Sequence, residues 1–152
     1  MSSLLHILLH PWHLVRRFVT SLPPTPPSVQ GEVWAEDHLS PAERALWVRL
    51  SNQDRRHSIG VAQRFDDARG GASRAEIAGA LLHDIGKIEC GLGTFGRVAA
   101  TVVGPRTERF RAYHDHEEIG ARMAAACGSD PATIELVAET GPAYEQLKAC
   151  DY

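Results

Sequence analysis

The chain has 152 residues, of which 43% are apolar and 23% charged, and its net charge at pH 7 is −3. These values are typical of one globular domain with a short tail, and they exclude collagenous, low-complexity and wholly disordered chains. A slightly acidic chain is a poor general binder of nucleic acid, so we expect no nucleic-acid partner. The three cysteines form no CxxC pair, which predicts reduced thiols in a cytoplasmic protein rather than disulfides or a structural zinc site.

The N-terminal stretch over residues 3–20 is apolar, but histidines and Pro11 interrupt it. A transmembrane helix needs roughly 18 or more nearly uninterrupted apolar residues, and no positive charge precedes the stretch as in a secretory signal. We expect an amphipathic helix that packs on the domain or on a second copy of the chain in a homo-oligomer. The alternative is peripheral membrane contact, with Trp12 among the lipid headgroups and Arg16-Arg17 on anionic lipid.

A proline-rich segment divides the chain. Four prolines lie between Pro23 and Pro27, and such a segment favours a stiff spacer. We therefore predict an N-terminal helix over 1–22, a linker over 23–30 and a folded domain over 31–152. No period-two alternation is visible in that domain, and its apolar residues recur at helical spacing, which predicts an all-α fold of about six or seven helices.

Capping residues mark the expected helix boundaries. Ser40 with Glu43, and Ser73 with Glu76, have the spacing of capping boxes. Breaks are predicted at Gly70-Gly71, Gly104-Pro105, Gly128 and Gly141-Pro142, and the last helix is expected over 142–152. The apolar positions expected in the core include Ile77, Leu81, Val98 and Ile134.

The densest chemical signal is His83 followed directly by Asp84, at the end of an apolar helix. Adjacent residues on a helix point about 100° apart, so both side chains can face one centre only near a terminus or across a local distortion. Gly86 is expected to supply the conformational freedom for that distortion. Imidazole nitrogens and carboxylate oxygens are ligands of divalent transition metals.

Residues on other predicted helices complete a family signature. His57, then His83-Asp84, then Asp151 resemble the H…HD…D pattern of the HD-domain superfamily of metal-dependent phosphohydrolases. The resemblance covers roughly residues 40–152 and includes the HDIGK motif and the later HEEIGA segment. It implies an all-α HD-domain bundle with a central metal site. It also implies that His57, His83, Asp84 and Asp151 hold one divalent transition metal ion per chain: Mn, Fe, Co, Ni or Zn.

A second ion is left open. His116 falls where dinuclear members of the family have a further histidine, and His114 is a nearby alternative, although both could equally be surface residues. The following helix lacks the histidine that those members have, and Glu139 is the candidate to replace it.

The chemistry expected of such a site is phosphoester hydrolysis by a metal-activated water. Asp84 could be both ligand and proton acceptor. Lys87, one turn further on, could meet a phosphate group, with Arg56 and Arg97 as weaker candidates. The alternative interpretation of Lys87 is a solvated cation at a helix end.

Three functions remain in view. The first is a phosphohydrolase acting on a nucleotide or another small phosphoester. The second is a metal-containing module that binds a nucleotide without turnover, since the chain is short and its N-terminal helix resembles a tether. The third is an iron-dependent oxygenase, which needs two irons and therefore more histidines than this pattern supplies.

Overall fold

The computed structural model describes residues 25–90 and 115–152. These residues form seven α-helices and one 3-10 helix and contain no strand, so the all-α prediction is confirmed for this part of the chain. The expected helix over 1–22, Arg97, Val98 and His114 lie outside the described residues.

The helices follow one another with short connections. In chain order they are α2 (Val29–Asp37), α3 (Pro41–Trp47), α4 (Asn52–Arg69), α5 (Arg74–Leu82), the 3-10 helix η1 (Ile85–Cys90), α8 (His116–Ala126), α9 (Pro131–Val137) and α10 (Tyr144–Cys150). Both predicted capping boxes are present, at Ser40 and at Ser73. Gly70 ends α4 in the left-handed conformation, with φ 66°, which a residue without Cβ adopts at little cost.

Three helix boundaries differ from the prediction. Helix α2 begins at Val29, within the expected linker, because Ser28 accepts a hydrogen bond from the Gly31 amide and caps the helix. Helix α9 ends at Val137, before the predicted break, and Glu139 then has φ 58°. Helix α10 is shorter than the range 142–152 and ends at Cys150.

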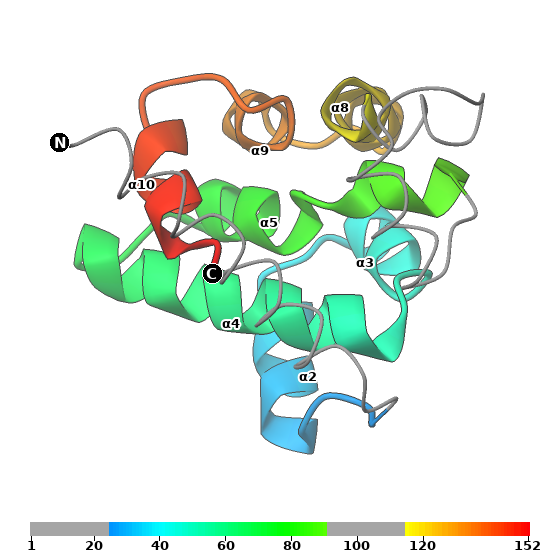
Figure 1. The fold of residues 1–152 in the computed structure, drawn as a ribbon, viewed down its shortest axis with the longest axis vertical. Coiled ribbons are helices and arrows are strands. Elements are labelled where there is room, and N and C mark those ends of the chain that lie inside the picture. The colour runs from blue at the N-terminus through cyan, green and yellow to red at the C-terminus, as the bar shows by residue number, and fades with distance from the viewer. Residues whose placement is uncertain (1–24, 91–114) are drawn as a thin grey trace, which may run out of the picture.

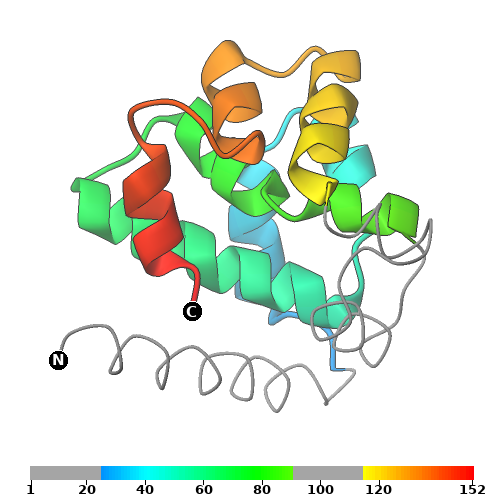
Figure 2. The same ribbon diagram turned by 45° about the horizontal axis from the view of Figure 1, so that its top comes forward.

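The helices form layers around α5 (Figure 1). Helices α8 and α9 lie side by side on one side of α5 and η1, and α4 lies on the other side with α2 beyond it. Figure 2 shows α10 lying against α4, with its C-terminal end near the middle of that helix. The C-terminal end of α10 is thereby brought next to the middle of α4.

Helix α5 is the central element because it is apolar on all sides. Every residue from Ile77 to Leu82 is buried, as expected for a helix that packs on both flanks. Gly79 allows the close approach of α9, since a Cβ there would lie 2.8 Å from the Cβ of Leu136. The predicted core positions Ile77 and Leu81 are confirmed, whereas Ile134 is only half-buried.

None of the helices in the two described ranges combines the length and the apolar character that a membrane-spanning helix needs.

Candidate metal centre

His83 lies at the C-terminal end of α5 and belongs to the candidate site. It is the C-cap residue of α5, and its Nδ1 lies 2.7 Å from the carbonyl oxygen of Ala80. A carbonyl only accepts, so Nδ1 carries the proton and Nε2 of the neutral ring has a lone pair. This Nε2 is buried and has no hydrogen-bond partner among the residues that the structure describes. A histidine held through one nitrogen, with the other open, has the arrangement typical of a metal ligand.

His57 and Asp151 face this nitrogen from two other elements. His57 Nε2, on α4, lies 2.7 Å from Oδ1 of Asp151, which directly follows α10. The same Oδ1 lies 3.9 Å from His83 Nε2, and the two imidazole centroids are 5.8 Å apart. One ligand atom from each of the three residues lies within 4.8 Å of the other two. Two imidazoles and a carboxylate therefore converge on one centre.

Asp84 lies beside this triad and links it to further charged groups. Its Oδ2 is 3.5 Å from His83 Nε2 and 2.7 Å from Lys87 Nζ, and its Oδ1 is 3.6 Å from His116 Nε2. The structure thus brings His57, His116 and Asp151, which are distant in the sequence, to the neighbouring residues His83, Asp84 and Lys87.

The pair His83-Asp84 faces one centre because the helix type changes there. Helix α5 ends at Leu82, and the 3-10 helix η1 begins at Ile85. Gly86 serves this turn in a different way from the one expected: its φ is not positive, and its importance is steric. A Cβ on Gly86 would lie 1.8 Å from the carbonyl oxygen of His116. The absence of that atom lets α8 begin directly against η1, which brings His116 to Asp84.

Lys87 is not a solvated cation at a helix end. Its side chain is 6% exposed and its ammonium group is paired with the equally buried Asp84 carboxylate. This ion pair neutralises one of the two carboxylates of the site.

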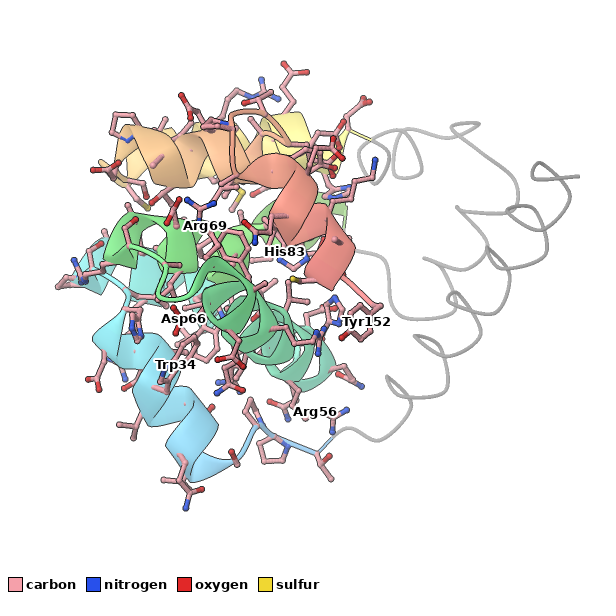
Figure 3. All side chains as sticks on the ribbon, turned by 90° about the vertical axis from the view of Figure 1, so that its left-hand side faces the viewer. Trp34, Arg56, Asp66, Arg69, His83 and Tyr152 are labelled. Atoms are coloured by element: carbon pink, nitrogen blue, oxygen red, sulfur yellow. The ribbon has the colours of Figure 1, made fainter. Side chains whose placement is uncertain are left out.

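Arg56 is directed away from the triad. Its Nη1 donates to the carbonyl oxygen of Thr25, 3.0 Å away, and to the Thr25 hydroxyl. Figure 3 shows Arg56 near the segment that precedes α2, well away from His83. Arg97 and His114, the other two weaker candidates, lie outside the described residues.

Glu139, the candidate to replace a missing histidine, contacts Tyr144. The Tyr144 hydroxyl donates to Glu139 Oε2 at 2.8 Å. Burial and the Glu139 carboxylate raise the pKa of the Tyr144 phenol above its ordinary value. This contact joins the end of α9 to the start of α10.

Arg64 was missed by sequence reasoning. Its guanidinium donates to the carbonyl oxygens of Cys150 and Tyr152, on both sides of Asp151. The last turn of the described chain is therefore held by protein contacts that need no metal ion. The sequence feature that could have indicated Arg64 is its spacing from His57. Arg64 follows His57 by about two helical turns and so lies on the same face of α4.

Comparisons of the chain with protein-family models, with curated proteins and with solved structures found no match. Any functional assignment for this chain therefore depends on the geometry of the site.

Proposed function

We propose that the chain is an HD-type metal-dependent phosphohydrolase that acts on a nucleotide or another small phosphoester. One observation carries the proposal: the buried Nε2 of His83, which has no hydrogen-bond partner within residues 25–90 and 115–152, lies beside the His57–Asp151 pair and the Asp84 carboxylate. A buried polar atom without a partner is unfavourable unless a ligand satisfies it. Imidazole and carboxylate together are typical ligands of Mn, Fe, Co, Ni or Zn.

His57, His83, Asp84 and Asp151 would hold the ion. When bound, a divalent ion would lower the pKa of its water to about 7 and would offer positive charge to phosphoryl oxygens. The hydrogen bond from His83 to Ala80 fixes the ring and its tautomer. The Asp84 and Asp151 carboxylates supply two negative charges, of which the Lys87 ammonium balances one, so the remaining negative charge favours binding of a cation.

The other residues of the site would act on the substrate. Asp84 is the proton acceptor for the attacking water, because it is the carboxylate closest to both His83 and His116 by the distances above. Lys87 holds its ammonium group 2.7 Å from that carboxylate, so it keeps Asp84 in place and adds positive charge where a phosphate would bind. His116 is the residue available for a second ion.

The test is release of phosphate or nucleoside from a nucleotide panel with Mn²⁺, Co²⁺, Ni²⁺ or Mg²⁺, with the metal content of the protein measured. Asp84→Asn should abolish release. His38→Ala is the matched control, because the His38 ring bonds to the Trp34 carbonyl at the end of α2, outside the site. Absence of turnover by the metal-loaded parent protein across the panel would contradict the proposal.

The second candidate is a metal-containing module that binds a nucleotide without turnover. It is favoured by the segment after α9, where the one acidic candidate for a second ion, Glu139, is held by Tyr144. Calorimetry that shows nucleotide affinity in the metal-loaded protein, together with no product in the assay above, would select it.

A further inference from the structure

One guanidinium group holds the backbone on both sides of Asp151. Arg64 Nε and Nη2 lie 3.0 and 2.9 Å from the carbonyl oxygen of Cys150, and Nη2 lies 3.0 Å from that of Tyr152. The Cys150 carbonyl is the last of α10, and the last carbonyls of a helix need partners from outside it. The planar fork of arginine suits this double contact, which a single ammonium could not reproduce in the same geometry.

The contact extends to the side chain of Tyr152. The Arg64 guanidinium carbon lies 4.4 Å from the Tyr152 ring centroid, which is within the range of a cation–π contact. Arg64 therefore fixes the chain immediately before and immediately after Asp151, while the Asp151 side chain itself bonds to His57.

The middle of α4 makes room for this arrangement. His57, Gly60 and Arg64 follow at spacings of three and four, so they share one face of the helix. A Cβ on Gly60 would lie 3.2 Å from Arg64 Nη1. Glycine inside a helix is destabilising by roughly 0.5–1 kcal/mol relative to alanine, and at this position it leaves space for the guanidinium.

We propose that Arg64 is a positioning residue that holds the Asp151 carboxylate toward His57 and His83 through the backbone on both sides of Asp151. The inference rests on the metal site proposed above and extends it to a residue that touches neither the ion nor the substrate. One face of α4 thus supplies both a ligand, His57, and the residue that aims the ligand contributed by the C-terminal segment.

A merely structural role predicts something different. Arg69 also joins α4 to α10, because its Nη1 donates to Gln146 Oε1 at 3.1 Å. Its other contacts in the described part of the chain are with Glu76 and Phe65, not with the neighbours of Asp151. If Arg64 only docked α10, its loss would weaken the attachment of α10 to α4 without changing the ligand set of the bound ion. If Arg64 positions Asp151, only its own loss should change the ligand set.

The experiment is a Co²⁺ titration of the full chain, followed by the visible absorption of the bound ion, which reports its ligand set. The variants are Arg64→Met, which keeps the apolar stem and removes every donor, Arg64→Lys, Arg69→Met and Asp151→Asn. Arg64→Met should lower Co²⁺ affinity by about 10–100-fold and shift the spectrum toward that of Asp151→Asn. Arg64→Lys should recover part of the affinity, and Arg69→Met should match the parent.

Each outcome separates the two proposals. Parent-like affinity and spectrum in Arg64→Met, or an equal loss in Arg69→Met, would overturn the positioning role while leaving the metal site standing. A parent protein that binds no Co²⁺ would overturn the metal site and this inference with it. If Arg64→Met does not fold, Arg64→Gln takes its place under the same criteria.

Discussion

The Asp84–Lys87 ion pair lies in the most enclosed part of the site, since both side chains are only 6% exposed. Removing two charges from water is unfavourable, and the mutual attraction offsets that loss only while both partners are present. Asp84 also faces His83 and His116 at 3.5 and 3.6 Å. The Lys87 ammonium, at 2.7 Å, is closer to this carboxylate than either imidazole. At the scale of single residues, Lys87 is therefore part of the metal-free fold as well as a candidate for phosphate binding.

We expect Lys87→Met to destabilise the metal-free protein by about 3–5 kcal/mol, the usual effect of breaking a buried pair. Saturating Mn²⁺ should reduce that loss, because a cation held at Asp84 offsets the same charge. Urea unfolding with chelator and with Mn²⁺ measures both values.

Lys148→Met is the matched control, since Lys148 is exposed on α10 and should change neither value by more than about 0.5 kcal/mol. An equal loss of stability with and without Mn²⁺ in Lys87→Met would show that the ion does not bind at Asp84.

Two glycines allow η1 and α8 to lie in direct contact. Besides the clash that Gly86 avoids, a Cβ on Gly120 would lie 3.0 Å from Val137 Cγ1 and 3.1 Å from the Gly86 nitrogen. A Cβ on Gly86 would overlap a backbone carbonyl group. A Cβ on Gly120 would come close to a side-chain methyl group and to a backbone nitrogen without such overlap. At the scale of the helices, His116 therefore lies next to Asp84 because the backbones of η1 and α8 approach each other closely.

Gly86→Ala should destabilise the fold by about 3 kcal/mol or more, at the upper end of overpacking effects, because a peptide carbonyl would have to move. Gly120→Ala should have a smaller effect, since its added Cβ would meet its nearest neighbours at 3.0–3.1 Å rather than at 1.8 Å, and alanine favours the helix. Urea unfolding of the two variants in chelator compares them. Equal stabilities would mean that η1 and α8 separate readily.

The connection between α9 and α10 contains a pH-dependent contact, the hydrogen bond from Tyr144 to Glu139. Burial and the carboxylate raise the pKa of the Tyr144 phenol, whereas the unfolded phenol ionises near pH 10. Above that pH the unfolded chain releases a proton that the folded chain keeps. The stability contributed by Tyr144 is thus fully present below pH 10 and is lost as the pH rises further.

Tyr144→Phe should therefore lose less stability than the parent between pH 9 and pH 11, as measured by urea unfolding at both values. Tyr152→Phe is the control and should follow the parent. A parallel decline of parent and Tyr144→Phe would contradict the prediction.

At the scale of the whole molecule, the site joins segments that are distant in the sequence. His57 is on α4, His83 ends α5, and Asp151 follows α10, 94 residues after His57. An ion held by these residues would add a further link between three elements that already meet through apolar packing and through the hydrogen bonds of Arg64 and Arg69. Ligands that bind only the folded state add to its stability by mass action.

Mn²⁺ at about a hundredfold excess over its Kd should raise the free energy of unfolding by about 2.7 kcal/mol. Asp151→Asn should lose most of this increment, because it removes a charged ligand. Asp67→Asn, an exposed aspartate of α4, should keep it. Thermal unfolding over a series of Mn²⁺ concentrations measures the increment, and an equal rise in Asp151→Asn would exclude Asp151 as a ligand.

The sequence by itself determined the features that depend on neighbouring residues. The capping boxes at Ser40 and Ser73, the left-handed end of α4 at Gly70 and the apolar character of α5 all follow from side chains within four or five positions. It was also predictable that the side chains of His83 and Asp84 face one centre, because a helix end was expected at that point.

Only the tertiary structure could decide which distant groups meet and at what cost. The burial of Lys87, the steric role of Gly86 and the contact of Arg64 with both neighbours of Asp151 all depend on how α8 and α10 pack against η1 and α4. Sequence spacing fixes which face of a helix a residue occupies, but it does not state which element covers that face. That choice is made by the packing of the whole bundle, and for this reason Arg64 became visible only in the folded chain.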